Sequence, residues 1–510
     1  MFNLLGSISW STVFFLLLML SMCSAFIILI PKVPVNYVHV HIGIIALSPI
    51  VAFMALVFNN ENVIIGPWHF DSLSWLWSTF VLTIGLIVQR YSVHYLLGDR
   101  SYRKYFALLT ATTVVDSLAW LSDDLRLLLI GWGFTLLGLT LLIGLRKEWK
   151  VARHASKTSG RYFVISWVIL LVAIVWIEQV TGHWQLSQVL RQDSLSRFNA
   201  WKKTGINLLL LVSTIIPAAQ WPFQRWLLDS VVAPTPISAI MHAGIVNAGS
   251  MMLTRFAPLF DGNSVQVVLL VLSSVSVLVG TGIMLVQVDY KRQLVGSTIA
   301  QMGFMLIECA LGAYLAAITH AVLHGLFKSA LFLQAGSAAG QHEPITYKVQ
   351  PSSYVWMVIG GILGLLLGVA FWLTSPTEGY QLVSALILGW SVVLAWIQLI
   401  AFGTGHIGRI TGIILFIGAA TVFQMVHITF ERLLQNALPV GIQQSISMGI
   451  LLLVILLVAS VMGTWFIRKN SKISLTIYLW LIRLGEPKRN LVESHPQYLT
   501  QLLSRGGNVH

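Results

Sequence analysis

The sequence predicts an all-α membrane protein, a polytopic bundle of about fifteen transmembrane helices with a broken seventh helix. Of its 510 residues, 56% are hydrophobic and only 10% are charged, whereas soluble domains carry about 25% charged residues. Most of the chain therefore faces something other than water. We expect one continuous bundle over residues 1–470, with its core motifs in 206–340, followed by a cytoplasmic amphipathic tail over 471–510.

The apolar stretches have the length that a bilayer requires, about 20 residues per helix. The first stretch lacks a basic segment before it and a small-residue cleavage site after it, so we expect a membrane helix and not a removed signal peptide. The predicted transmembrane helices lie near residues 8–31, 39–58, 70–92, 104–121, 125–145, 161–180, 206–228, 236–257, 265–288, 293–313, 315–336, 353–374, 380–402, 409–430 and 444–468.

The basic residues fall in alternate loops. Lys and Arg concentrate in residues 90–104, 146–161, 291–292 and 468–472, whereas the loop over 59–69 contains neither. The positive-inside rule then predicts a multi-pass membrane protein with its N-terminus outside and its C-terminus in the cytoplasm. The same rule explains the net charge of +13, so the expected surroundings are a lipid bilayer and not a nucleic acid. Residues 181–205 are basic but long and polar, and we expect them to lie along the surface.

The predicted eleventh helix carries three titratable residues in register. His320, His324 and Lys328 recur every fourth position, and such residues share one stripe of a helix. Charged groups inside a membrane are costly and usually functional. A buried lysine can also release its proton, because burial disfavours the charged form. A row of such groups favours a proton relay, although two core histidines and a lysine that reaches the surface would give the same spacing.

The predicted seventh and eighth helices combine prolines with buried polar residues. Pro217 and Pro222 interrupt helical hydrogen bonding, and non-helical backbone at membrane depth is tolerated where it lines protein or a water cavity. A helical break next to a buried histidine suggests a hydrated site. The alternative is a kink that only improves the packing of the helices. We assign Pro234 and Pro236 to the same break, and the proton-path candidates near it are Asp229, His242 and Asn247.

Three scattered acids, Asp116, Glu178 and Glu308, lie inside predicted helices, and we assign Asp116 and Glu308 to the proton path. Asp116 lies inside the predicted fourth helix, whereas Glu308 lies near the end of the tenth and could simply face water. Two distant cysteines, Cys23 and Cys309, provide neither a disulfide framework nor a zinc site. We therefore expect no metal, no cofactor and no catalytic activity in this chain.

Three blocks in order carry a resemblance to a known family. They are the stretch WPFQRWLLDSVVAPTPISAIMHAGIVNAGSMMLTRF (221–256), the stretch 288–304, and the stretch 320–336. These blocks resemble the proton-conducting membrane transporter family. That family includes the antiporter-like subunits of NADH-quinone oxidoreductase and of multisubunit cation/proton antiporters. The resemblance implies the antiporter-like subunit fold.

The sequence also departs from that family. Where the respiratory subunits carry a glutamate in a Gly-Trp-Glu motif, this chain reads Gly131-Trp132-Gly133, and Pro217 stands where the family has a lysine. The predicted helix 353–374 is wholly apolar and lacks the family's distal lysine. With these groups missing, ordinary redox-driven pumping is not expected.

The stretch 221–256, the reduced chain length and the lost acidic site together make this sequence resemble the DabB-type membrane subunits of two-component inorganic carbon accumulation systems. This resemblance implies a subunit that conducts protons or sodium ions and drives CO2 hydration to bicarbonate. The chemistry would lie in a large DabA-type partner that holds zinc on the cytoplasmic face. The alternatives are a respiratory pump subunit, a subunit of a cation/proton antiporter, and a scaffold that only anchors the partner.

The tail over residues 473–505 mixes apolar and basic residues, among them Tyr478, Trp480 and Arg483. This mixture is typical of a helix that lies in the membrane interface. It would also serve as a docking element for a partner. We therefore expect either an interfacial helix or a docking segment on the cytoplasmic face.

Overall fold

The computed structural model describes residues 9–58, 62–337, 354–374, 405–435, 437–438 and 472–486, with a few single positions between 449 and 458. The predicted helix near 380–402, most of the one near 444–468, the loop 338–353 and the end of the tail lie outside these residues. Within the described part, eight helices are long and apolar enough to cross a membrane. The predicted all-α membrane bundle is confirmed.

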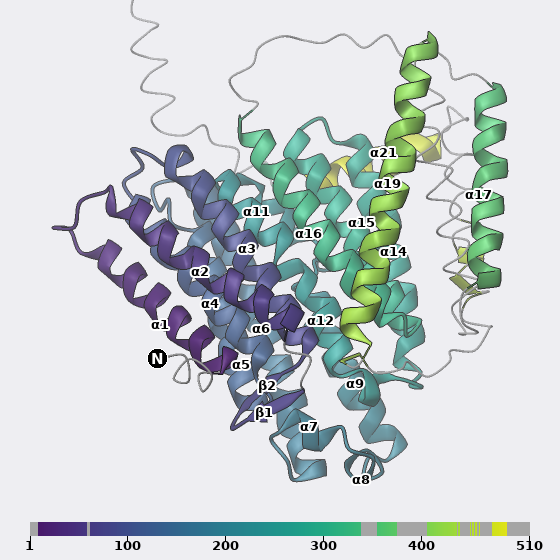
Figure 1. Cartoon of the computed structure of the whole chain (residues 1–510). Coiled ribbons are helices and arrows are strands. Elements are labelled where there is room, and N and C mark those ends of the chain that lie inside the picture. The colour runs from purple at the N-terminus through teal and green to yellow at the C-terminus, as the bar shows by residue number, and fades with distance from the viewer. Residues whose placement is uncertain are drawn as a thin grey trace, which may run out of the picture.

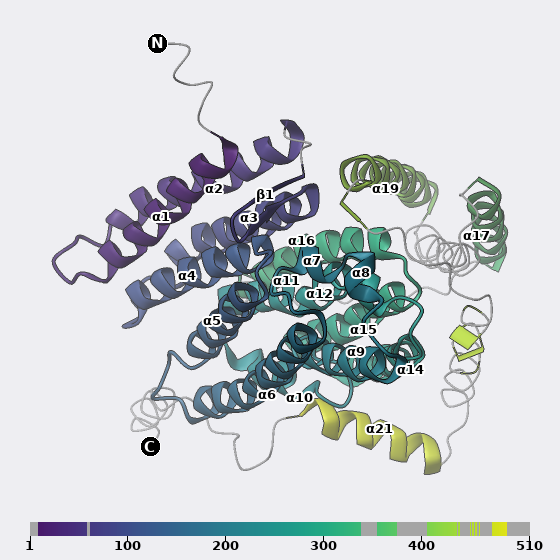
Figure 2. The same ribbon diagram turned by 90° about the horizontal axis from the view of Figure 1, so that it is seen from below.

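The first part of the bundle consists of long helices that pack in the order of the chain. Each of them contacts the next one along the sequence, and Figure 2 shows α1 and α2 at one edge of the molecule. These helices are α1 (Trp10–Leu29), α2 (Tyr37–Phe58), α3 (Ser72–Tyr95), α4 (Tyr102–Leu121), α5 (Leu125–Ile143) and α6 (Lys150–Thr181).

The second part contains a run of mostly short helices, from α7 to α13, followed by longer ones. Helices α17 and α19 stand on the side of the molecule opposite α1 and α2 (Figure 1). The elements are α7 (Leu186–Val189), α8 (Gln192–Leu195), α9 (Ala200–Ile215), α10 (Arg225–Asp229), η2 (Ser230–Val232), α11 (Thr235–Ala243), η3 (Ile245–Asn247), α12 (Ala248–Arg255), α13 (Ala257–Phe260), α14 (Val265–Val286), α15 (Tyr290–Ala310), α16 (Tyr314–Ser337), α17 (Tyr354–Thr374), α19 (Gly405–Leu434) and α21 (Lys472–Gly485).

A small β-hairpin is an addition to the predicted all-helical fold. Strands β1 (Val63–Ile65) and β2 (Trp68–Phe70) pair antiparallel, with Ile64 opposite His69. Gly66 has a positive φ of 60°, which glycine adopts without steric cost and which suits a two-residue turn. The hairpin lies at the same end of the molecule as α7 and α8 (Figure 1). Backbone outside the bilayer can pair in this way because it need not satisfy its hydrogen bonds within a helix.

The opposite end of the bundle gathers several basic loops. Arg103 donates to the backbone carbonyls of Ile28, Ile30 and Val33 at the end of α1. Arg146, after α5, pairs with Asp99 at 2.8 Å. These contacts tie together the loops after α1, α3 and α5. The arrangement agrees with the antiparallel succession of spans that the sequence predicts.

The predicted break in the seventh helix is confirmed. Helix α9 ends at Ile215 and the next helix, α10, begins only at Arg225. Pro217 lies in the irregular segment between them, and the Trp221–Pro222 peptide bond is cis. The carbonyl of Ile216 accepts the backbone N–H of Ala219 at 3.0 Å and also the indole N–H of Trp226 at 2.8 Å, so Trp226 ties α10 to the end of α9.

The assignment of Pro234 and Pro236 to this break is wrong. Pro234 is the N-cap of α11 and Pro236 lies in its first turn, where a missing N–H costs nothing because no intrahelical acceptor exists there. The eighth span breaks further along, at Gly244, between α11 and the short 3-10 helix η3. This second break, which the sequence analysis did not predict, lies in the middle of the span Thr235–Arg255.

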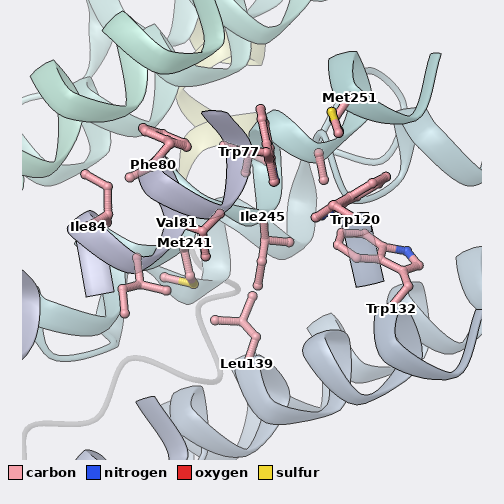
Figure 3. Close-up of a cluster of buried hydrophobic side chains, with 14 of the residues drawn as sticks. Trp77, Phe80, Val81, Ile84, Trp120, Trp132, Leu139, Met241, Ile245 and Met251 are labelled. Atoms are coloured by element: carbon pink, nitrogen blue, oxygen red, sulfur yellow. The ribbon is translucent and has the colours of Figure 1, made fainter. Parts of the chain in front are cut away.

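A layer of large apolar side chains surrounds this second break. Figure 3 shows Trp77, Phe80, Val81 and Ile84 of α3 with Ile245 of η3. Trp120 of α4 and Trp132 and Leu139 of α5 belong to the same cluster. Helices α3, α4 and α5 therefore cover one face of the broken span, and α16 packs against α11 as well.

Candidate proton pathway

The titratable row lies at the interface between α15 and α16. A ring nitrogen of His320 on α16 lies 3.3 Å from the carboxylate of Glu308 on α15, and its other nitrogen lies 2.9 Å from Oε1 of Gln301. Gln301 and Glu308 are seven residues apart and therefore lie on the same face of α15. The structure thus gives Glu308 a partner inside the bundle. One face of α15 supplies both groups that hold His320.

Lys328 lies two helical turns further along α16. Its side chain is only 2% exposed, and its Nζ donates to the backbone carbonyl of Leu294 at 3.2 Å. No carboxylate among the described residues pairs with it. A buried ammonium without a counter-ion is costly, so a group in this position is suited to change its charge state.

His324 lies between these two groups. Its ring centroid is 6.2 Å from that of His320, and it lies within electrostatic range of His320, Lys328 and His242. It is 6% exposed, and neither ring nitrogen has a hydrogen-bond partner in the described protein. A neutral imidazole always presents one donor and one acceptor. His324 can therefore donate one hydrogen bond to a molecule in this interface and accept another.

The broken span contributes His242 and Asn247 to the same interface. His242 lies 3.1 Å from the hydroxyl of Thr298 on α15 and stacks on Phe332 of α16, with ring centroids 4.3 Å apart. The amide of Asn247 donates to the carbonyl of Ala243 at 2.6 Å and to that of Ala321 on α16 at 3.2 Å. Asn247 therefore satisfies a carbonyl that the break at Gly244 leaves open, and it ties the break to α16.

Buried polar atoms without a protein partner gather near this interface. In native proteins such atoms are rare, and each one calls for an explanation such as a bound water. On α11, η3 and α16 the residues concerned are Ser238, Asn247, Thr319 and His324. These polar side chains provide sites at which water could be held along α11 and α16.

Two candidates from the sequence lie apart from the row. Asp229 is the last residue of α10 and forms an ion pair with Arg225 at 3.0 Å, so its charge is already balanced. Asp116 on α4 lines a small cavity together with Gly244 and Ile245. The cavity is on the face of α11 that meets α3, α4 and α5, whereas His242 faces α15 and α16. Their places in a proton path stay predictions.

Sequence reasoning missed two polar groups of the interface and one outside it. Gln301 and Thr298 hold His320 and His242, and a polar residue every three or four positions in the predicted tenth helix was the available signal. His41 on α2 is fully buried, with its ring nitrogens 2.9 Å from the hydroxyls of Ser24 and Thr110. A histidine inside an otherwise apolar span could have identified it.

The position of the family's missing glutamate is physically closed. A Cβ built on Gly133 would lie 2.6 Å from Nε1 of Trp167, and this indole donates to the carbonyl of Leu129 at 2.9 Å. The Trp167 ring occupies the space into which a longer side chain at residue 133 would extend. The neighbouring helix thus fills the site from which the glutamate is absent.

A buried ion pair holds the C-terminal end of the broken span. Arg255, the last residue of α12, pairs with Asp71 before α3 at 2.6 Å. Burial alone would raise the pKa of the Asp71 carboxyl, but the adjacent Arg255 guanidinium lowers that pKa to about 2. Asp71 also accepts the N–H of Ser74 at 2.8 Å and so caps α3. The ends of α3 and α12 are therefore joined by one carboxylate.

The tail helix α21 packs against the bundle. A Cβ on Gly282 of α14 would meet the side chain of Leu481 at 2.9 Å, and Arg225 lies 3.5 Å from the carbonyl of Leu484. Leu475, Tyr478 and Trp480 remain exposed. Figure 2 shows α21 along the side of the bundle near α10 and α14. One side of this helix therefore contacts the chain itself, and the other is free for lipid or a partner.

Two family profiles match the chain. One describes the transmembrane region of NADH:quinone oxidoreductase and Mrp antiporter subunits and matches residues 122–411. The other describes the N-terminus of chain 5 of NADH-ubiquinone oxidoreductase (complex I) and matches residues 67–106. The first match covers more than half of the chain.

Similar proteins show to which group of this family the chain belongs. A probable inorganic carbon transporter subunit DabB of Bacillus anthracis is 55% identical over 505 residues, which cover 99% of both chains. The chain belongs to the DabB group of this family. A DabB of Bacillus subtilis is also 55% identical, over 97% of this chain and 98% of its own length.

A solved structure of the Mrp complex from Dietzia sp. DQ12-45-1b shares the fold of this DabB-group chain. The TM-score is 0.65 at 20% identity, over 97% of this chain and 59% of the matched one.

The described residues of the chain contain no group of three or more His, Cys, Asp or Glu side chains that could hold a metal ion.

Proposed function

We propose that this chain is the proton-conducting membrane subunit of a two-component inorganic carbon accumulation complex in the bacterial inner membrane. Protons move along the row Glu308, His320, His324 and Lys328, and their flow drives CO2 hydration in a zinc-containing partner subunit. The partner binds the cytoplasmic face, where the C-terminus of this chain lies and where bicarbonate is retained. Sodium is the alternative cation, and its conduction along the same path has to be tested.

The row along α15 and α16 carries this proposal. His320, His324 and Lys328 lie on one stripe of α16, and Glu308 meets this stripe from α15. Glu308 and His320 are in contact at 3.3 Å, and the rings of His320 and His324 follow at 6.2 Å. Eight residues of helix separate His320 from Lys328, a rise of about 12 Å, which is a large part of the membrane's apolar thickness.

The chemistry follows from the donor and acceptor groups. Glu308 delivers a proton to His320, and the carboxylate left behind stabilises the imidazolium. His324 accepts the proton on one nitrogen and releases one from the other, because an imidazole can do both. Lys328 then takes up the proton and releases it toward the cytoplasmic end, while the Leu294 carbonyl stabilises its charged form. His242 senses this charge across the interface.

The names of the relatives support a subunit of a carbon transporter, and the resemblance to DabB-type proteins supports the zinc partner. Coupling between two chains requires a shared element whose equilibrium both sites shift. The broken spans are suited to this task because Asn247 ties the break at Gly244 to α16. A filled Gly133 position argues against the alternative of a respiratory pump that uses a glutamate there.

The test is to co-express the chain with its genomic neighbour that encodes the partner. The purified complex should contain zinc, and it should restore growth of a carbonic-anhydrase-deficient strain in air. Lys328→Ala should abolish both growth and proton uptake into proteoliposomes that hold the complex. The control is Lys32→Ala, since Lys32 is an exposed lysine in the loop after α1. Full growth and proton uptake with Lys328→Ala would disprove the row as the path.

The tail provides a separate test of the partner's position. Removal of residues 473–510 should weaken copurification of the partner and abolish carbon accumulation, while the bundle still inserts. The exposed Tyr478 and Trp480 should account for most of this loss, and alanine substitutions there should mimic the truncation. A truncated chain that retains both partner and activity would make the tail an interfacial anchor only.

A further inference from the structure

Asp116 lies on a cavity that is separate from the row. The cavity has a volume of about 20 Å³, enough for about one water molecule. Besides Asp116, its walls consist of Phe80, Val81, Ile84, Thr112, Thr113, Thr135, Ile240, Gly244 and Ile245. None of these other residues has a titratable side chain. Figure 3 shows Val81, Ile84 and Ile245 in the apolar layer that surrounds this place.

The carboxyl group of Asp116 is buried without a cation beside it. The residue is 5% exposed, and its Oδ1 accepts a hydrogen bond from the indole of Trp120 at 3.1 Å. Among the residues that the structure describes, no charged group lies near enough to affect its ionisation. An ionised carboxylate is costly in such a place. The acid is therefore at rest in its neutral form.

The threonine hydroxyl groups around the cavity have no proton free to donate into it. Thr112 donates its hydroxyl proton to the carbonyl of Leu108 at 2.7 Å, Thr113 to that of Leu109 at 3.0 Å, and Thr135 to that of Gly131 at 3.0 Å. With their protons committed to backbone carbonyls, these hydroxyl oxygens can only accept further bonds. A cavity of acceptors favours a bound proton, or a water that donates, over a bare carboxylate.

The cavity adjoins the break between α11 and η3. Gly244 forms part of its wall, and on the far side of the break Asn247 reaches the carbonyl of Ala321 on α16. A movement of η3 would therefore change both the access of water to Asp116 and the contact with α16. The two faces of the broken span share this hinge.

We propose that Asp116 is a second protonation site, independent of the row on α16. The carboxylic acid releases its proton to water when the break at Gly244 opens the cavity, and the carboxylate recovers a proton before it closes. The O–H bond of the acid breaks, and the proton leaves as hydronium. Whether Asp116 holds its proton therefore depends on whether the break at Gly244 is closed or open.

Infrared difference spectroscopy on the purified full complex tests this proposal. The difference between the spectra of wild type and Asp116→Asn at neutral pH should isolate the carbonyl stretching band of one protonated carboxylic acid, which should persist in Glu308→Gln and weaken as the pH rises. It should also shift after exchange into deuterated water. Asp71→Asn serves as the control, because the ion-paired Asp71 should contribute no such band. Lys328→Ala should leave the band in place, so this site can fail or succeed independently of the row.

Two results would overturn the proposal. If wild type and Asp116→Asn gave the same spectrum at neutral pH, Asp116 would be ionised at rest. A band that neither exchanged with deuterium nor weakened at alkaline pH would mean a permanently protonated structural acid. Asn and Asp have nearly the same shape, and elution as a single species with the partner would confirm that the variant folds.

Discussion

The two faces of the broken span Thr235–Arg255 differ in the number of titratable groups that they meet. Toward α15 and α16, His242 and Asn247 lie at the interface that holds Glu308, His320, His324 and Lys328. Toward α3, α4 and α5, the same span meets an apolar layer that contains one isolated acid, Asp116. A row can pass a proton on, whereas a single buried acid can only hold or release one. The same break can therefore adjoin both a path and a storage site.

The largest expected effect breaks the row at its middle. His324→Leu removes both ring nitrogens and leaves His320 and Lys328 about 12 Å apart along the helix. We expect proton flux through the complex to fall about 100-fold, the order that a positioned acid–base group contributes. Flux into proteoliposomes measures this loss, and His39→Leu, at the exposed start of α2, is the control. Unchanged flux would mean that protons bypass α16.

The next effect concerns the clamp formed by Asp71 and Arg255, which joins the end of α12 to the start of α3. Arg255→Ala leaves the carboxylate of Asp71 buried without its partner, which should cost about 3–5 kcal/mol of stability. The thermal unfolding temperature of the solubilised protein should fall accordingly. Gly43→Ala, with open space around the added methyl group, should leave it unchanged.

The pH dependence of the same clamp follows from its pKa. The carboxyl of Asp71 has a pKa of about 2 in the folded protein and about 3.9 when unfolded. A lowered pKa means that the ion pair stabilises the fold above the unfolded value and that this stability is lost as the pH falls toward 2. Wild type should therefore lose more stability than Asp71→Asn between pH 4 and pH 2. Parallel acid curves would show that the pair does not stabilise the fold.

The smallest effect tests why the family's glutamate site is closed. Gly133→Ala places a methyl group against Trp167, and overpacking of this kind costs about 1–3 kcal/mol. The unfolding temperature should drop, and the second change Trp167→Phe should restore part of the loss because it removes the Nε1 that the methyl group meets. If Gly133→Ala were as stable as wild type, Trp167 would not be what excludes a side chain at residue 133.

Local periodicity made part of this site predictable. The i, i+4 spacing of His320, His324 and Lys328 fixes them on one stripe of any helix, and Pro217 marks a break because it lacks a backbone donor. Length and hydropathy likewise predicted the bundle, because a bilayer sets the number of apolar residues per span.

Only the tertiary structure decided which partners these residues have. The pairing of His320 with Glu308 and Gln301 depends on how α15 lies against α16, and the isolation of Asp116 depends on the apolar side chains that three other helices place around it. The break at Gly244 was not evident because glycine permits a break without requiring one. The sequence determined the composition of each helical face by itself, whereas packing between helices decided which faces meet, because contacts between residues far apart in the chain do not follow from local periodicity.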